Sequence, residues 1–172
     1  DLAVLAIGSI ESHGRHNPLG TDTLVPARLL EMIEEKNDQY LIAPTIPYGA
    51  TDDLTAYPGT IDLGSKLTYE VLKKVTESLY EHGARRFLVL NGHGGNVNPL
   101  DRLSLEWHRK GVWMAVINWW VLAGELNETW AGGHGDFEET AAVMGVDPAL
   151  VDTSLLAPQN LLNDVPESLP TQ

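Results

Sequence analysis

Phe87-Leu88-Val89-Leu90-Asn91-Gly92-His93-Gly94-Gly95-Asn96 is the most informative segment of this 172-residue chain. Its four apolar residues show no polar alternation, which predicts a strand buried on both faces, as in a parallel sheet. A glycine-rich loop with one histidine follows at once. Asn98-Pro99 then predicts the cap and first residue of a helix that runs to Arg109. Strand, glycine loop and helix in this order are typical of an α/β fold.

The same alternation continues on both sides of this segment. In the region 65–82, Leu67, Val71, Val75 and Leu79 recur every four residues and predict a helix that ends at His82-Gly83. Residues 44–62 are rich in Gly, Pro, Thr and Asp and predict a long loop. The order of elements indicates a single three-layer α/β domain over 1–172, with a mostly parallel sheet flanked by helices. Further strands are expected at 2–7, 41–43 and 112–117, and further helices at 23–36 and 138–144.

Three glycine-flanked segments carry the residues suited to chemistry. Two of them, which begin at Gly8 and Asn91, follow predicted strands directly. They therefore lie at the carboxyl ends of strands, where ligand sites form in open parallel sheets. Glu11 and His13 are two residues apart, so in an extended strand end they point the same way. Asp22 follows shortly before a helix, where either Asp22 or Thr23 is also a possible N-cap. The segments read Gly8-Ser9-Ile10-Glu11-Ser12-His13-Gly14, Asn91-Gly92-His93-Gly94-Gly95-Asn96 and Gly132-Gly133-His134-Gly135-Asp136-Phe137-Glu138-Glu139-Thr140.

Composition excludes several classes of partner and site. The net charge is −13, which argues against nucleic acid or an anionic membrane as partner, because both need a basic surface. The chain has no cysteine, so any metal must be held by His, Asp, Glu or backbone oxygen. No apolar run approaches the roughly 18 residues of a membrane helix, and we expect a cytoplasmic protein. Because the chain opens directly on an apolar strand, we also expect residues to be missing at the termini.

The joint pattern of these segments resembles the creatininase (creatinine amidohydrolase) family. The resemblance implies a hydrolase of non-peptide carbon–nitrogen bonds, most simply in a cyclic amide such as creatinine, with a small molecule as substrate. It also implies two divalent ions, Zn, Mn or Fe, and a homo-oligomer, often a hexamer. The matching stretches appear in the family's order and comprise Gly8 through Asp22, Tyr48-Gly49, Tyr57-Pro58-Gly59-Thr60, Asn91 through Asn96, and His134 through Thr140.

The resemblance assigns roles to individual residues. It implies that Glu11, Asp22 and His93 bind one ion, and that His13, Asp22 and Glu139 bind the other. Mixed carboxylate and imidazole ligands suit Zn, Mn or Fe(II), and two such ions activate water to a hydroxide that attacks the carbonyl. Glu139, which we also count as catalytic, takes the place of a glutamate that creatininase carries in its Asn-Gly-His loop.

The expected catalytic acid/base and the substrate contacts lie outside this ligand set. His134 matches the acid/base histidine of the family and would protonate the departing nitrogen. Trp120 and Trp130 match aromatic positions that flank the substrate, although packing in the core or at an interface is an equally good account of them. Gly94 and Gly95 are expected to contact the substrate.

Several departures and alternatives stay open at this point. Ser12 stands where the family has Gln, Asp52-Asp53 where it commonly has Glu-His, and the family's C-terminal segment is not recognisable after Val151. These differences concern substrate recognition more than the metal core. Ser9 is either an orienting group for the ligand loop or a small turn residue. His16 is either a group that supports the site or contacts the substrate, or a histidine of a surface loop.

Three other functions compete with the cyclic amidohydrolase. One is a formamide deformylase of pyrimidine metabolism, and another is a peptidase-like enzyme, both within the same family. The third is a non-catalytic protein: either a metal- or nucleotide-binding module that keeps the fold, or an unrelated α/β protein that binds phosphate at the loop Gly92–Asn96. The complete set of ligand candidates favours an enzyme.

Overall fold

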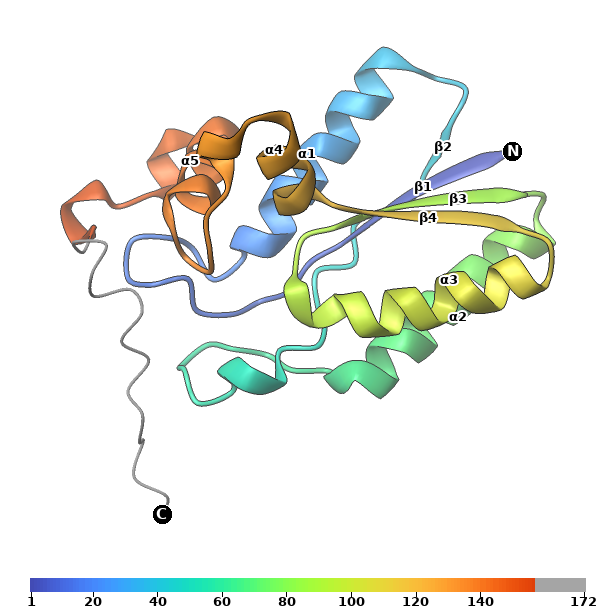
Figure 1. Ribbon diagram of the computed structural model, residues 1–172, viewed down its shortest axis with the longest axis horizontal. Helices are drawn as coiled ribbons and strands as arrows, with labels where there is room; N and C mark the ends of the chain where they lie inside the picture. The colour runs from blue at the N-terminus through green and yellow to red at the C-terminus, as the bar shows by residue number, and fades with distance from the viewer. Residues whose placement is uncertain (157–172) are drawn as a thin grey trace.

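Four parallel strands form the sheet, in the order β2-β1-β3-β4 (Figure 1). The structure is a computed structural model that describes residues 1–156, apart from the side chain of Asp53. The central pair, β1 and β3, is in register along its whole length, from Leu2 opposite Arg86 to Ile7 opposite Asn91. Each expected strand is confirmed, with ends that differ by at most one residue. The strands are β1 (Leu2–Ile7), β2 (Leu41–Ile42), β3 (Arg86–Asn91) and β4 (Trp113–Asn118).

Helices cover both faces of the sheet and complete the expected three layers. In Figure 1, α2 and α3 lie together on one face, and α1, α4 and α5 lie on the other. None of the helices within residues 1–156 is both long and apolar enough to cross a membrane. The helices are α1 (Thr21–Lys36), α2 (Gly64–Glu81), α3 (Val97–Arg109), α4 (Trp119–Leu126) and α5 (Phe137–Val146), with short 3-10 turns at Asp52–Leu54, Gly94–Asn96, Glu128–Trp130, Pro148–Leu150 and Thr153–Leu155.

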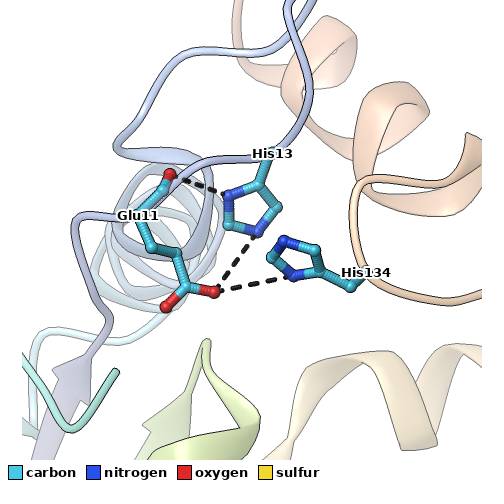
Figure 2. A group of neighbouring side chains, drawn as sticks. All are labelled: Glu11, His13 and His134. Atoms are coloured by element: carbon cyan, nitrogen blue, oxygen red, sulfur yellow. Dashed lines mark hydrogen bonds and ion pairs between the residues drawn. The ribbon is translucent and has the colours of Figure 1, made fainter. Parts of the chain in front are cut away.

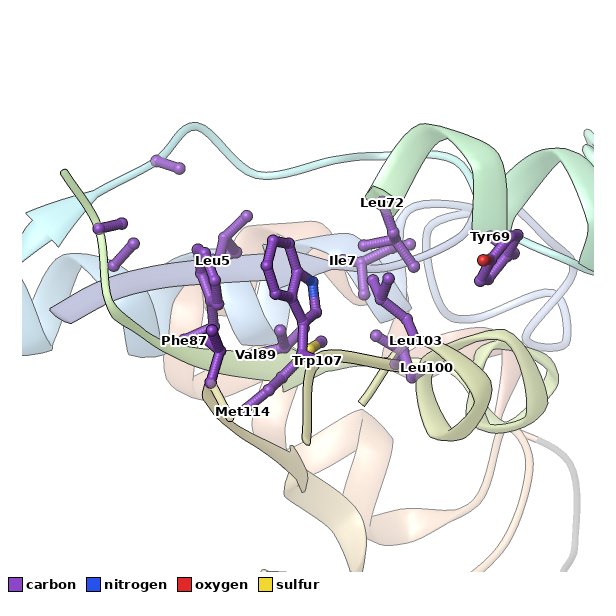
Figure 3. Packing of buried hydrophobic residues seen from close by; sticks show 14 residues of the cluster. Leu5, Ile7, Tyr69, Leu72, Phe87, Val89, Leu100, Leu103, Trp107 and Met114 are labelled. Atoms are coloured by element: carbon purple, nitrogen blue, oxygen red, sulfur yellow. The ribbon is translucent and has the colours of Figure 1, made fainter. Parts of the chain in front are cut away.

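The core lies on both faces of the central strands, because successive side chains of a strand point to opposite faces. Val4 and Ala6 of β1 pack toward α1, where they meet Leu30. The alternate residues of β1 pack toward α2 and α3, in the larger of the two clusters (Figure 3). That cluster includes Leu5, Ile7, Tyr69, Leu72, Phe87, Val89, Leu100, Leu103, Trp107 and Met114.

The buried face of α2 overlaps only in part with the row of residues that its apolar spacing indicates. Leu67 is 50% exposed, whereas Tyr69, Leu72 and two threonines are buried. Burial of Thr76 is possible because its hydroxyl donates to the carbonyl of Leu72 and accepts a hydrogen bond from Trp107 Nε1 at 3.0 Å. The apolar period therefore predicts the helix correctly and the packed face in part, since Val75 and Leu79 pack against the larger cluster whereas Leu67 does not.

Candidate metal centre

The five predicted ligand residues meet at the carboxyl ends of β1 and β3, which is where ligands bind in sheets of this type. Glu11 and His13 come from the loop after β1, and His93 from the loop after β3. Asp22 lies in the first turn of α1 and Glu139 in the first turn of α5. Glu11 and His13 are fully buried, and the other three side chains are at most 11% exposed. Residues far apart in sequence thus form one buried cluster.

Asp22 is available to this cluster because it does not cap its helix. The expectation that Asp22 or Thr23 is the N-cap is wrong, since α1 begins at Thr21 after Gly20 and has no side-chain cap. Thr23 instead donates its hydroxyl proton to the carbonyl of Ser9 at 2.9 Å. The carboxylate of Asp22 turns into the site, where Ser9 Oγ donates to Oδ2 at 2.9 Å. Ser9 therefore orients a site residue, which agrees with its interpretation as an orienting group and not as a small turn residue.

The two histidines divide the oxygens of Asp22 between them. His93 Nδ1 lies 2.9 Å from Asp22 Oδ2 and 3.1 Å from Glu11 Oε1. His13 Nε2 lies 2.9 Å from Asp22 Oδ1 and 3.4 Å from Glu139 Oε2. In each of the resulting groups, Glu11/Asp22/His93 and His13/Asp22/Glu139, the ligand atoms lie within 4.8 Å of one another. The structure thus brings together the residues that the resemblance assigns to each ion, with Asp22 common to both groups.

Both histidines are oriented by backbone carbonyls. His93 Nε2 donates to the carbonyl of Ala50 at 2.7 Å, and His13 Nδ1 donates to the carbonyl of Glu11 at 3.2 Å (Figure 2). The second nitrogen of each ring then faces the carboxylates. This arrangement is typical of histidines that ligate metals, because the outer hydrogen bond fixes the tautomer and the ring orientation. Sequence reasoning missed Ala50, since a backbone carbonyl leaves no signature in the residue types.

The cluster contains polar atoms that the protein itself does not satisfy. Both carboxylate oxygens of Glu11, Nε2 of His13 and Oδ1 of Asp22 are buried with no hydrogen-bond partner of acceptable geometry among the described residues. Each such atom costs about 1–3 kcal/mol when it is left unsatisfied. Divalent cations would satisfy these atoms together, and mixed carboxylate and imidazole donors suit Zn, Mn or Fe(II). The residues present fit the predicted pair of ions.

The charges of the cluster shift several pKa values. Burial lowers the pKa of His13 and His93, but the close contact of each ring with Asp22 and the nearby carboxylate charges outweigh burial and raise these pKa values to about 9 and about 10. Burial acts to raise the pKa of Asp22, yet the close contacts with His13 and His93 hold it well below its usual range. Burial and the charge of Asp22 raise the pKa of Glu139 to about 7.

His134 lies at the rim of the cluster, on the loop before α5 (Figure 2). Its side chain is 45% exposed, and Nε2 donates to the carbonyl of Ser12 at 2.6 Å. Nδ1 lies 3.6 Å from Glu11 Oε1, and the ring centroid is 4.4 Å from that of His13. Burial and the charge of His13 lower the pKa of His134. Because Glu11, His13 and His134 also form a group with metal-ligand spacing, His134 is within reach of either a ligand or an acid/base role.

A cavity of about 520 Å³ opens over the cluster. Gly94, Gly95 and Trp120, three of the four predicted substrate contacts, line it. Trp130 lies in the turn Glu128–Trp130, is 51% exposed and is not among the lining residues. None of the lining residues is Lys or Arg, whereas five are Asp or Glu: Glu11, Asp22, Asp52, Glu138 and Glu139.

Asn96 holds the loops of the site together, a role that sequence reasoning missed. The residue is fully buried, and its Oδ1 accepts a hydrogen bond from the amide of Ala50 at 3.0 Å. Its Nδ2 donates to the carbonyl of Gly8 at 3.0 Å. Asn96 thereby connects the end of β1 to the loop that carries the acceptor of His93. Its place in a glycine-rich loop was visible in the sequence, but its partners, 46 and 88 residues away, were not.

Comparisons with known proteins agree with this architecture. The family model for creatinine amidohydrolase matches residues 1–168. The mycofactocin precursor peptide peptidase of Mycobacterium tuberculosis is 39% identical over 167 residues, which cover 87% of this chain and 60% of that protein. The creatinine amidohydrolase of Pseudomonas putida is 25% identical over 173 residues, covering 88% of this chain and 66% of the relative.

Solved structures show the same fold. A crystal structure of creatininase superposes with a TM-score of 0.75 at 24% identity, over 91% of this chain and 68% of that one. The chain thus spans about three fifths to two thirds of the length of its relatives. Its fold and its match over nearly all residues show that the chain belongs to the creatininase (creatinine amidohydrolase) family.

Proposed function

We propose that the chain carries the catalytic centre of a metal-dependent amidohydrolase, which uses water to cleave an amide carbon–nitrogen bond. The observation that carries this proposal is the pair of ligand groups, Glu11/Asp22/His93 and His13/Asp22/Glu139, which share one aspartate. When bound there, two divalent ions would lower the pKa of a water molecule and polarise the substrate carbonyl. Solved structures include a Mn form of creatininase and a Zn-Zn form of a creatininase mutant, which supports Mn or Zn among the expected metals.

His134 is the residue we propose for proton transfer. Its Nε2 proton is held by the carbonyl of Ser12, so Nδ1 is the atom left to exchange protons beside Glu11. The lowered pKa keeps Nδ1 free to accept a proton from the attacking water near neutral pH. The same atom then donates that proton to the departing nitrogen.

The shape and charge of the cavity bear on the substrate. Creatinine-like cyclic amides remain the simplest substrate class, and a volume of about 520 Å³ leaves room for a larger group. The relative named as a peptide peptidase supports a peptide amide as the second candidate. A nucleotide or other phosphorylated compound is disfavoured, because outside the ligand set the charged residues among the described cavity lining are the carboxylates Asp52 and Glu138, with neither Lys nor Arg to bind a phosphate. This weighs against the deformylase and nucleotide-binding alternatives.

The proposal is tested by hydrolysis after chelation and reconstitution. The protein is stripped with a chelator, reloaded with Zn, Mn or Fe(II), and assayed for amine release. The panel contains cyclic amides, short peptides, and formamides with and without a phosphate group. We expect metal-restored hydrolysis of an unphosphorylated amide. Full metal loading without hydrolysis of any amide would instead support a binding module.

A further inference from the structure

The threonine that follows Glu139 ties α5 to the loop after β1. Thr140 Oγ1 accepts a hydrogen bond from Asn17 Nδ2 at 3.0 Å and lies 3.0 Å from His16 Nε2. The same hydroxyl donates to the carbonyl of Asp136 at 2.9 Å. Because its single proton is used there, the hydroxyl accepts from both loop residues, which places a proton on His16 Nε2. His16, Asn17 and Thr140 are all at most 8% exposed, so this connection is shielded from water.

A second contact on the same segment lies close to His13. Gly135 adopts a φ of +66°, and a Cβ there would come within 3.3 Å of the His13 backbone. The amide of Gly135 donates to Glu139 Oε2 at 2.6 Å, the same oxygen that lies 3.4 Å from His13 Nε2. Residues 135–140 therefore meet the loop on both sides of Glu139, through close packing at Gly135 and through hydrogen bonds at Thr140.

The two ligand groups depend on this connection unequally. Glu11, Asp22 and His93 come from the loops after β1 and β3 and from α1, which are anchored on the sheet. Glu139 alone is supplied by α5, and it belongs only to the group with His13 and Asp22. A change that releases α5 from the loop should displace one ligand of the second group and none of the first.

We infer that His16 and Asn17, acting through the Thr140 hydroxyl, are positioning residues that set Glu139 against His13 and so determine the affinity of the second cation position. This inference rests on the proposed two-cation function. It also decides between the two interpretations of His16, since a buried histidine bonded to the neighbour of a ligand supports the site and is not a surface residue. Hydrogen-bonded residues behind metal ligands are typically worth 10- to 100-fold in metal affinity.

The experiment is a calorimetric titration of the metal-free protein with Mn²⁺ or Zn²⁺, which resolves two binding events. In Thr140→Val, the side chain keeps its shape but loses the hydroxyl. We expect the first event to keep its affinity and the second to weaken by roughly 10- to 100-fold. Thr140→Ser, which restores the hydroxyl, should recover the second event. Glu139→Ala provides the reference for complete loss of the ligand.

Two further variants separate positioning from a general loss of stability. Thr76→Val removes another buried threonine hydroxyl, which binds Trp107 away from the site, and should leave both events unchanged. Asn17→Ala keeps Thr140 and should also lower the affinity of the second binding event. It therefore tests the inference if Thr140→Val does not fold.

Two outcomes would overturn the inference while leaving the proposed function intact. One is wild-type affinity for both cations in Thr140→Val and Asn17→Ala, and the other is equal weakening of both events in these variants. A wild-type protein that binds fewer than two cations would count against the two-cation function itself.

Discussion

The paired histidines show how protons and metals compete for the same atoms. His13 and His93 each use one ring nitrogen to donate to a backbone carbonyl and direct the other at carboxylates. Without metal, a proton on that second nitrogen offsets the carboxylate charges, which is why both pKa values are raised. A cation at the same position must displace these protons.

This competition predicts opposite pH dependences for the metal-free and metal-bound proteins. Cation affinity should rise with pH while these nitrogens are protonated and level off as the pH passes the pKa values of about 9 for His13 and about 10 for His93. A raised pKa stabilises the folded metal-free chain below the unfolded value of 6.5. That stabilisation is lost as the pH rises through about 9 and about 10.

Calorimetry in a series of buffers, together with thermal melts of the stripped protein, measures both trends. A cation affinity that is independent of pH would contradict displacement of protons from these histidines.

Replacement of His134 separates its two available roles. As an acid/base residue, its loss in His134→Ala should keep both cations and reduce kcat by roughly 10²–10⁴-fold. His82→Ala, which removes an exposed histidine at the end of α2, is the matched control and should change neither quantity. Loss of a cation together with activity in His134→Ala would show that it is a ligand in the group with Glu11 and His13.

At the scale of elements, uninterrupted apolar runs make the strands predictable, whereas the helix α4 was not predicted. The helix α4 follows β4 without an intervening turn, and its sequence, WWVLAGEL, is apolar on nearly all sides. Neither a periodic pattern nor a glycine or proline marks the change from strand to helix at Asn118. The predicted start of α1 was also wrong. Asp is a residue type common at N-caps, but the carboxylate of Asp22 points into the site and does not cap the helix.

Close packing of the loop after β3 predicts different outcomes for its two adjacent glycines. A Cβ at Gly95 would lie 2.0 Å from the carbonyl oxygen of Ala50 and 2.6 Å from His93 Nε2, the two atoms whose hydrogen bond orients His93. Gly95→Ala should therefore weaken the first cation by roughly 10- to 100-fold. Nothing lies within 4 Å of a Cβ at Gly94, so Gly94→Ala should bind cations as the wild type does. Similar affinities for the two variants, measured by titration, would contradict this account.

For the molecule as a whole, residue types predict which residues form the site better than they predict the contacts that keep those residues in place. Carboxylates and histidines beside glycines, at the ends of predicted strands, suffice to nominate Glu11, His13 and His93. The supporting hydrogen bonds join residues that are distant in the chain. They are those from His93 to the carbonyl of Ala50, from the side-chain amide of Asn96 to Gly8, and between His16 and the hydroxyl of Thr140. Such contacts have no local pattern in a single sequence.

Exposed apolar residues on α4 are where we expect self-association to occur. Val121, Leu122 and Leu126 of α4 are 41–70% exposed, and Trp130 lies close behind in the chain. Large exposed apolar patches are typical of interfaces, and the family resemblance implies a hexamer. We therefore predict a homo-oligomer by size-exclusion chromatography with light scattering. Leu126→Glu should shift the equilibrium toward smaller species, and a wild-type protein that is monomeric at every concentration would contradict the prediction.

The central claim is that two cations occupy the groups that share Asp22, and metal content measured by elemental mass spectrometry tests it most directly. We predict about two equivalents of Zn, Mn or Fe per wild-type chain. The Glu11→Gln/His93→Ala double variant, which removes two ligands of the first group, should lose that metal. A wild-type chain that holds no metal, even after reconstitution, would contradict the claim.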